Sequence, residues 1–226
     1  MNGLRNWRPF RDWCLGLLGT VVAVAACYLW LDRPIAQLAH DQFAQFHLFE
    51  KLTLLPEALT PLAVVAFLAL GLRGLTGRGL SRFQTVLLVS GISLAVAVII
   101  KDELKFAFGR AWPDTWVRHN PSFIHDGVFG FFPFHGGPGY AAFPSGHTTA
   151  ICTVMTVLWL CYPRFRPVYA LSMAAVAIGL VGANFHFLSD VIAGGFLGVS
   201  VGWLGVVMWE IGARQVRPPA GDAKDG

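Results

Sequence analysis

The stretch FQTVLLVSGISLAVAVII, residues 83–100, runs for eighteen positions without a charged side chain. A helix that crosses the hydrocarbon of a bilayer needs about 20 such residues, within a range of roughly 17–25. A transmembrane β-strand would alternate polar and apolar residues over about 10 positions, and this stretch does not alternate. Five further apolar stretches lie at residues 13–31, 52–72, 148–162, 168–185 and 188–211. We therefore expect an all-α polytopic membrane bundle with six transmembrane helices.

The composition of the whole chain favours the same class of protein. Hydrophobic residues make up 55% of the 226 residues and charged residues only 13%, whereas a soluble domain carries about 25% charged residues. This chain has too few charges to cover a soluble globule, which excludes a cytosolic or a disordered protein. The formal net charge of +4 is small, and no dense basic segment points to a nucleic-acid partner. The four cysteines fall within apolar stretches, so we expect core residues rather than disulfide bonds or a zinc site.

The distribution of Lys and Arg predicts how the helices cross the membrane. Eleven of these residues lie at the two ends of the chain or in the connections on the same side, and six lie on the other side. Because cytoplasmic connections carry the excess of positive charge, we expect both termini in the cytoplasm. The long connection between the third and fourth helices, about residues 101–144, would then lie on the periplasmic or extracellular face of a bacterial inner membrane.

The domain organisation is expected to be simple, with a single transmembrane domain over residues 1–216 and a disordered tail at residues 217–226. Three arginines precede the first apolar stretch, as they would in a signal peptide. That stretch is long for a signal peptide, however, and Trp30, Leu31 and Asp32 occupy the place where a cleavage site would lie. We therefore expect an uncleaved first helix.

Three polar clusters lie at the predicted outer ends of the apolar stretches. They are KDELKFAFGRAWP at residues 101–113, FPSGHTT at residues 143–149 and HFLSD at residues 186–190. Ionisable side chains are costly near the hydrocarbon and usually mark a functional site. Since all three clusters fall on the same predicted face of the membrane, we examine each for the chemistry that it can supply.

The FPSGHTT cluster has the features of an anion site at the start of a helix. Ser145 is a natural N-cap, and Gly146 allows a ligand to approach the backbone. The free N–H groups and the positive end of the helix dipole would bind a phosphate, and His147 would lie beside it. The alternative is a simple cap with a histidine at the membrane interface.

The HFLSD cluster separates a histidine and a carboxylate by four residues. On one helix, His186 and Asp190 would share a face. The carboxylate would then hold one imidazole nitrogen and leave the other free to attack. Ser189, however, can cap a helix that starts after it, which would place His186 outside that helix. The alternative is a buried histidine beside a capping aspartate.

The KDELKFAFGRAWP cluster supplies cations at the end of the third stretch. Lys105 and Arg110 are five residues apart, and Gly109 loosens the chain between them. Two cations near a helix N-terminus suit a phosphoryl group, which an arginine can bind in a bidentate manner. The alternative is a pair of ordinary basic residues that flank a membrane helix.

Taken together, the clusters resemble the type-2 phosphatidic acid phosphatase family, which also includes vanadium haloperoxidases. The signature of that family is Lys, six residues, Arg-Pro; then Pro-Ser-Gly-His; then Ser-Arg, five residues, His, three residues, Asp. Residues 144–147 match the middle part, and His186 and Asp190 match the end of the third. Both arginines of the signature are missing, because their positions hold Trp112 and Leu180. We expect Arg110 to replace the first arginine, with Asn184 or Arg118 as candidates for the second.

The resemblance implies a two-step phosphoryl transfer that needs no metal and no other cofactor. His186 would attack phosphorus and form a phosphohistidine, which Asp190 would orient and stabilise. His147 would protonate the leaving alkoxide and then activate water. The residues expected to bind the phosphate are Lys105, Arg110, Ser145 and Gly146.

The resemblance and the predicted position of the site imply a lipid phosphate monoester or diphosphate as substrate, reached from the bilayer. We therefore expect a metal-independent membrane lipid phosphatase. Two alternatives stay open, namely a lipid-to-lipid phosphotransferase and a non-catalytic member that only binds a lipid phosphate. The sequence favours neither a particular lipid nor a particular oligomeric state.

Overall fold

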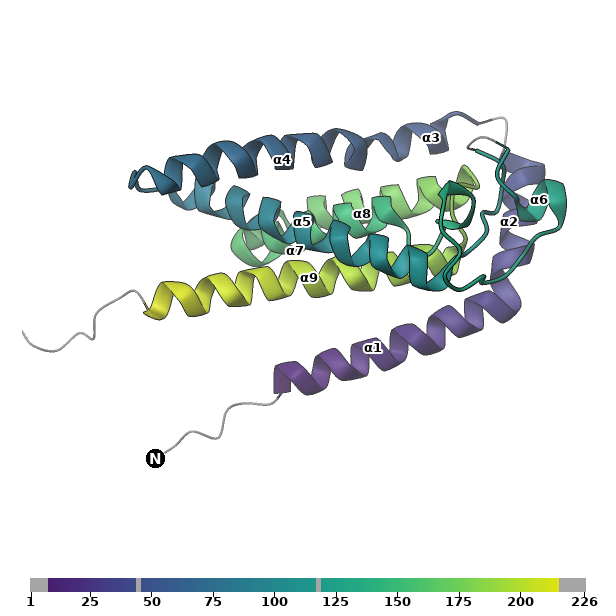
Figure 1. The fold of residues 1–226 in the computed structure, drawn as a ribbon, viewed down its shortest axis with the longest axis horizontal. Coiled ribbons are helices and arrows are strands. Elements are labelled where there is room, and N and C mark those ends of the chain that lie inside the picture. Colours follow the sequence, from purple (N-terminus) through teal and green to yellow (C-terminus); the bar gives the residue numbers. More distant parts are fainter. Residues whose placement is uncertain (1–7, 44–45, 117–118, 216–226) are drawn as a thin grey trace, which may run out of the picture.

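The computed structural model describes residues 8–43, 46–116 and 119–215, and no β-strand lies within these ranges. The chain forms an elongated helical bundle with a loop region at one end (Figure 1). The helices are α1 Arg8–Ala26, α2 Asp32–Phe43, α3 Leu48–Leu52, α4 Leu54–Leu75, α5 Arg82–Phe108, α6 Phe123–Asp126, α7 Gly146–Cys161, α8 Arg166–Gly182 and α9 Leu188–Gln215. The predicted tail 217–226 and the candidate Arg118 lie outside the described residues.

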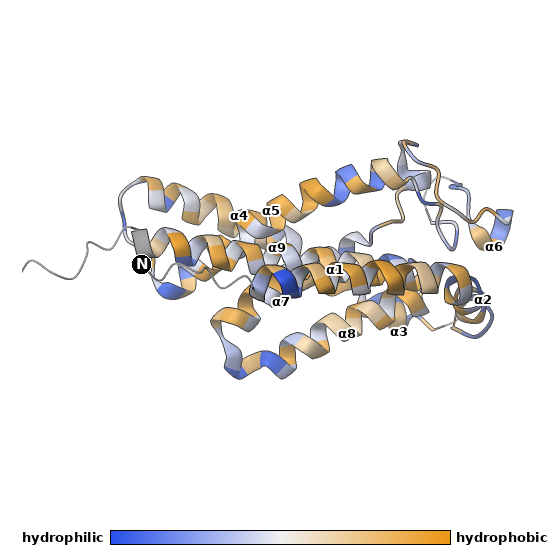
Figure 2. Ribbon diagram, turned by 90° about the horizontal axis from the view of Figure 1, so that it is seen from below, coloured by the Kyte–Doolittle hydropathy of each residue, from blue (hydrophilic) through white to orange (hydrophobic). Residues whose placement is uncertain are grey.

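Five helical segments of the described chain are long and apolar enough to cross a membrane. They are Pro9–Phe43, Leu48–Leu75, Arg82–Phe108, Pro163–Gly182 and Leu188–Ala213. Figure 2 shows apolar residues along most of the length of these helices. The all-α prediction is confirmed, and five of the six expected spans correspond to such segments. The remaining one, α7, is an apolar helix of only 16 residues, so a sixth span stays a prediction.

The first span is longer than the sequence indicated. A π-helical segment, Cys27–Leu31, joins α1 to α2, so that one continuous helix extends to Phe43. The chain changes direction near this segment, and α2 runs across the loop end of the bundle (Figure 1). Because π-helical turns shift the register of a helix, the segment decides which side chains at the start of α2 face the bundle. One of these is Asp32, which is buried.

Helices α7 and α9 lie in very close contact. A Cβ atom added at Gly194, Gly198 or Gly202 would lie 2.5 Å from a backbone oxygen of α7 or of its N-cap residue. Glycines spaced by four residues allow two backbones to approach in this way, and the sequence already indicates such packing. Since Ser145 N also donates a hydrogen bond to Asp190 O at 3.0 Å, the first turns of the two helices are fixed against each other.

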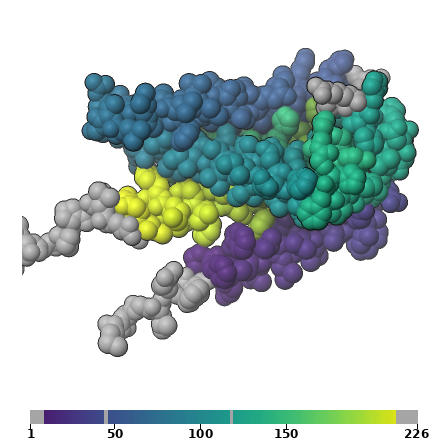
Figure 3. Space-filling view, in the orientation of Figure 1, coloured from purple at the N-terminus to yellow at the C-terminus, as the bar shows by residue number. Residues whose placement is uncertain are grey.

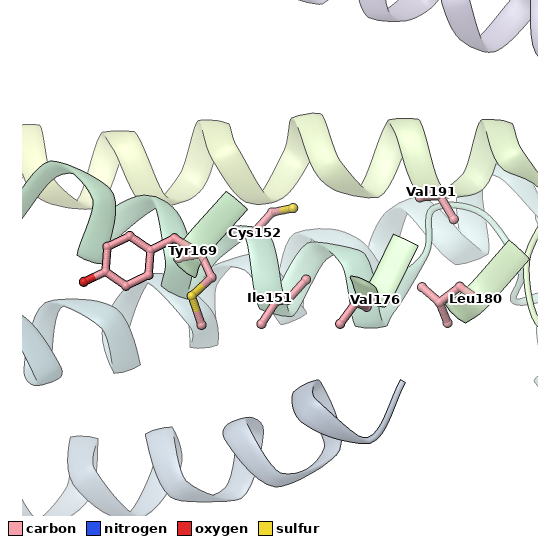
Figure 4. Packing of buried hydrophobic residues seen from close by; sticks show 7 residues of the cluster. Ile151, Cys152, Tyr169, Val176, Leu180 and Val191 are labelled. Atoms are coloured by element: carbon pink, nitrogen blue, oxygen red, sulfur yellow. The ribbon is translucent and has the colours of Figure 1, made fainter. Parts of the chain in front are cut away.

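A buried apolar cluster lies between α7, α8 and α9, and two further clusters join α5 to α7. Figure 4 shows the first cluster, in which side chains of all three helices meet. Leu180 of α8 belongs to it and is fully buried. Leu180 occupies the position of the second signature arginine, so this chain uses that position for core packing. The four cysteines are free thiols, and three of them are buried, as expected.

Helix α5 begins with a capping box and ends at a glycine. Ser81 and Gln84 form the box, in which each side chain accepts a hydrogen bond from the other residue's backbone. Gly109 ends the helix in a left-handed conformation with φ 58°. A Cβ there would lie 1.8 Å from Phe132 O, so only glycine fits. Helix α5 therefore extends past residue 100 and carries Lys101 and Lys105 on its last turns.

The segment between α5 and α7 folds over one end of the bundle as a compact cap (Figure 3). Phe143 contacts the rings of Phe108 and Phe131 with centroid separations of 4.9 and 5.3 Å, which ties the cap to α5. The start of α1 and the end of α9 lie toward the opposite end of the bundle (Figure 1). This separation agrees with the predicted topology, while the assignment of the two ends to membrane faces stays a prediction.

Candidate active site

A cavity of about 610 Å³ opens at the capped end of the bundle, between α4, α5, α7 and the segment that precedes α9. Its polar lining comes from two lysines, two histidines, Glu57 and Thr60, and its apolar wall includes Trp112, Trp116 and Phe185. Four of the residues selected from the sequence line this cavity, namely Lys105, Gly146, His147 and His186. The structure thus brings the three polar clusters together, although they lie far apart in the sequence.

His186 lies in the short connection between α8 and α9 and is only 4% exposed. Its Nδ1 is 3.5 Å from Asp190 Oδ2, which is close enough for the imidazole and the carboxylate to attract one another but too long for a formed hydrogen bond. The two residues do not share a helix, because α9 begins at Leu188 and His186 precedes it. Asp190 instead turns back in the first turn of α9, where its Oδ2 accepts from Phe187 N at 3.0 Å. The structure brings the two expected residues next to each other, by a different backbone route from the one the spacing indicated.

The environment of His186 favours its neutral form. Burial lowers the pKa of the imidazole below its ordinary value, and the Asp190 carboxylate only partly offsets this effect. Lys105 and His147 lower the same pKa further, because their positive charge disfavours a second cation nearby. The ring of Trp112 packs against the imidazole with 5.0 Å between centroids. A neutral imidazole held by Asp190 is the form that can act as a nucleophile.

His147 lies in the first turn of α7 on the same cavity, with its side chain 35% exposed. Its Nε2 is 3.6 Å from Glu57 Oε1, which comes from the first turn of α4. Glu57 was not selected from the sequence, because the apolar stretch around it carries no motif. The carboxylate faces a histidine that is open to the cavity, so the pair can hold a proton where a leaving group would lie.

Two lysines, rather than a lysine and an arginine, supply the positive charge of the cavity. Lys101 and Lys105 are four residues apart on α5 and both line it. Lys105 Nζ donates to Ala141 O at 2.6 Å and lies 5.5 Å from the ring centroid of Trp112. A Cβ added at Gly146 would lie 3.7 Å from Lys101 Nζ, so this ammonium lies beside the start of α7. Lys101 was missed in the sequence analysis, although its helical spacing from Lys105 was a usable signal.

Arg110 does not line the cavity and is fully buried. Its Nη2 donates to Asp32 Oδ2 at 2.7 Å, and its Nη1 donates to Asp190 Oδ1. Removing one partner of a buried ion pair costs about 3–5 kcal/mol, so these carboxylates hold the guanidinium away from any phosphate. The structure therefore does not bring Arg110 to the other predicted phosphate-binding residues, and its replacement of the first signature arginine stays a prediction. Trp112, at the signature position itself, does reach the cavity but carries no charge.

Ser145 caps α7 as the sequence indicated, and it does not line the cavity. Its Oγ accepts from Thr148 N at 3.4 Å, and its side chain is fully buried. Asn184, a candidate for the place of the second signature arginine, is also buried and does not line the cavity. Its backbone carbonyl accepts a hydrogen bond from Trp116 Nε1 at 3.1 Å. Within the described ranges, no three His, Cys, Asp or Glu side chains are grouped so as to hold a metal ion.

Comparisons with known proteins identify the family of this chain. A profile of the PAP2 superfamily matches residues 86–212. A lipid A 1-phosphatase of Rhizobium etli is 33% identical over 117 residues, which cover 51% of this chain and 46% of that protein. A second lipid A 1-phosphatase, from Rhizobium johnstonii, is 35% identical over 97 residues, or 42% of this chain and 36% of that protein. The matched region therefore spans less than half the length of either relative.

The fold also matches a solved structure. The crystal structure of the first transmembrane PAP2-type phosphatidylglycerolphosphate phosphatase from Bacillus subtilis aligns with a TM-score of 0.56. The alignment covers 92% of this chain and 98% of that one at 19% identity. At this level of identity the match concerns the arrangement of the helices and not the substrate.

Proposed function

Because this chain belongs to the PAP2 superfamily, the type-2 phosphatidic acid phosphatases, we propose that it hydrolyses a lipid phosphate in the cavity between α4, α5 and α7. One observation carries the proposal. His186 and His147 line a single cavity together with two lysines, at the N-terminus of a helix. A nucleophile, a proton donor and an anion site are the parts that metal-independent phosphoryl transfer requires.

In the proposed first step, His186 Nε2 attacks phosphorus and a P–N bond forms while the bond to the leaving oxygen breaks. Asp190 keeps the proton on Nδ1 and stabilises the positive charge that develops on the ring. His147 gives its proton to the leaving alkoxide, and Glu57 holds the His147 ring at the cavity. The product of this step is a phosphohistidine and a free lipid alcohol or lipid monophosphate.

In the second step, His147 takes a proton from water, and the water oxygen attacks phosphorus. The P–N bond breaks, inorganic phosphate leaves, and His186 returns to its neutral form. Because His147 donates a proton in one step and accepts one in the other, the two steps restore the starting state of the enzyme.

The phosphate oxygens would be bound by Lys101, Lys105 and the free N–H groups at the start of α7, among them that of Gly146. These groups would stabilise the charge on the transferring phosphoryl group. Two ammonium groups provide point charges instead of the planar fork of an arginine. Ser145 contributes indirectly, since it caps α7 and orients the first turn.

The substrate would be a lipid that enters the cavity from the bilayer, with its phosphate at the capped end. The relatives named as lipid A 1-phosphatases make lipid A the first lipid to test, followed by phosphatidylglycerol phosphate. From the distribution of Lys and Arg we place the capped end on the periplasmic or extracellular face, with both termini in the cytoplasm. Transfer of the phosphoryl group to a second lipid uses the same residues and would be recognised by its product.

The test is phosphate release from lipid A, phosphatidic acid and phosphatidylglycerol phosphate by the purified protein in liposomes. We expect His186→Ala to abolish release from every lipid that the wild-type protein hydrolyses, because no nucleophile remains. His47→Ala is a matched control, since the His47 side chain is 79% exposed and is not part of the cavity lining. Near-normal release by the His186 variant would refute the mechanism, and a phosphorylated lipid in place of free phosphate would identify a phosphotransferase.

A further inference from the structure

Three buried charged side chains meet behind the catalytic histidine. Asp32 comes from the first turn of α2, Arg110 from the chain just after α5, and Asp190 from the first turn of α9. All three side chains have no exposed surface. Burying isolated charges is costly, and these three side chains offset that cost by pairing with one another, although Arg110 Nε has no hydrogen-bond partner.

Within this charged cluster of Asp32, Arg110 and Asp190, both oxygens of the Asp32 carboxylate accept hydrogen bonds. Its Oδ2 accepts from Arg110 Nη2 at 2.7 Å and from the Ser189 hydroxyl, and its Oδ1 accepts from Ser189 N at 3.0 Å. Three donors thus satisfy both oxygens of this buried carboxylate. On the other side, Arg110 Nη1 donates to Asp190 Oδ1 and to Ser189 Oγ, the latter at 2.6 Å.

Aromatic rings enclose the guanidinium of Arg110. Its Cζ lies 4.4 Å from the ring centroid of Phe187, 4.9 Å from that of Phe131 and 5.5 Å from that of Tyr28. These rings exclude water from the charged cluster, so charges within it interact more strongly than they would at a surface. The net charge of the cluster therefore matters to any group beside it, and with both carboxylates ionised that charge is −1.

We propose that Asp32 is a positioning residue for the phosphoryl transfer, because it neutralises Arg110 and so leaves Asp190 with an uncompensated negative charge for His186. The inference rests on the proposed function of His186 as the nucleophile. Without Asp32, Arg110 and Asp190 would form a neutral pair. The positive ring of the phosphohistidine would then face a carboxylate whose charge Arg110 already neutralises.

The charge balance favours the intermediate over the resting state. Before attack, the neutral imidazole lies beside a cluster of charge −1. After attack, the ring is positively charged and the buried groups together are neutral. An interaction that strengthens along the reaction accelerates it. Asp32 would act in this way although it touches neither the substrate nor His186.

The ionisable groups that face His186 come from three helices. Asp190 of α9 raises the pKa of His186, while Lys105 of α5 and His147 of α7 lower it. A change at Asp32 alters none of these contacts directly. A shift in the titration of His186 would therefore report the altered net charge of the buried cluster.

The test compares Asp32→Asn with the wild-type protein in the phosphate-release assay. We expect kcat to fall about 10- to 100-fold, as for the loss of one charge-assisted interaction, with little change in KM. We also expect the acid limb of the pH profile to move to lower pH, because the uncompensated negative charge that favours protonated His186 is lost. Adding Arg110→Gln to this variant leaves Asp190 uncompensated again and should restore part of kcat.

Asp41→Asn is the matched control, since Asp41 lies on the exposed face of the same helix. If Asp32→Asn is folded and shows an unchanged kcat and acid limb, the inference is overturned. If that variant does not fold, Arg110→Gln tests the same charge balance in the opposite direction and should move the acid limb to higher pH. No shift in that variant would also overturn the inference.

Different experimental results would refute the proposed function of His186 and the role of Asp32. Activity that survives His186→Ala removes the nucleophile and with it the whole mechanism. Activity that is lost in His186→Ala but unaffected by Asp32→Asn removes only the role assigned to Asp32.

Discussion

Replacing Lys101 by alanine should remove one of the two cations that we propose bind the phosphate. The Lys101 side chain lies in the second-last turn of α5, is 17% exposed and lines the cavity. Its partner, Asp102, is 58% exposed, and such surface ion pairs contribute about 0–1 kcal/mol. The ammonium can therefore leave Asp102 for a phosphate at little cost.

The expected size of the effect follows from the contacts of the two lysines. Lys105 Nζ already donates one hydrogen bond to Ala141 O, at 2.6 Å, so it cannot replace every donor lost with Lys101. A hydrogen bond to a charged group is worth about 1.5–3 kcal/mol. The loss of one such bond in the transition state lowers kcat/KM about 10- to 100-fold.

The assay is phosphate release from the preferred lipid, with kcat and KM measured for three variants. Lys101→Ala should show the full loss, and Lys101→Arg should retain more activity than the alanine variant because the charge remains. Lys51→Ala, an exposed lysine of α3 outside the cavity lining, should behave as the wild type. If Lys101→Ala matches Lys51→Ala, then Lys101 does not bind the phosphate and our assignment of the cations is refuted.

Two further predictions concern the helix contact and the nucleophile. Gly198→Ala should destabilise the protein by about 1–3 kcal/mol, because the added Cβ would lie 2.5 Å from Thr149 O; Gly212→Ala, with nothing within 4 Å, is the control. Thermal unfolding in detergent measures both, and equal melting temperatures would contradict the close contact. In the pH profile of kcat/KM, the midpoint of the fall on the acid side should lie below the ordinary histidine pKa of about 6.5. Burial lowers the pKa of His186, so the neutral form persists until the pH falls through that lowered value; a midpoint above the ordinary value would contradict the burial argument.

The parts of the fold that follow from local composition could be predicted from the sequence. Long uncharged stretches indicate membrane helices wherever they occur, and the glycines of α9 indicate a close helix contact by their spacing alone. The extension of the first helix to Phe43 could not be foreseen, because residues 32–43 are polar enough to suggest a loop. The π-helical turn that joins them depends on contacts with the rest of the bundle.

Part of the candidate site could likewise be predicted from the sequence, and part could not. The family motifs identify His147, His186 and Asp190, since their order and spacing are properties of the sequence. Arg110 was assigned to the phosphate because it lies near Lys105 in the chain. The left-handed Gly109 turns the backbone at the end of α5, so Arg110 leaves the helix face that the lysines share.

Residues that enter the site from distant segments left no such signal. Asp32 and Glu57 lie 157 and 90 positions before Ser189 and His147, the residues that they contact in the structure. Neither belongs to a motif, and only the packing of α2 and α4 brings them to the capped end of the bundle. Sequence spacing describes neighbours within one helix, whereas these contacts depend on how the helices assemble.

The most direct test of the central claim is to stop the reaction during turnover and locate the phosphoryl group by mass spectrometry. The lipid substrate is mixed with the purified protein and quenched in alkali, since a phosphorus–nitrogen bond to histidine survives base and is lost in acid. We expect a phosphorylated peptide that contains His186 in the wild-type protein, and none in His186→Ala. Phosphate release without any such peptide, or a phosphoryl group on another residue, would show that His186 is not the nucleophile.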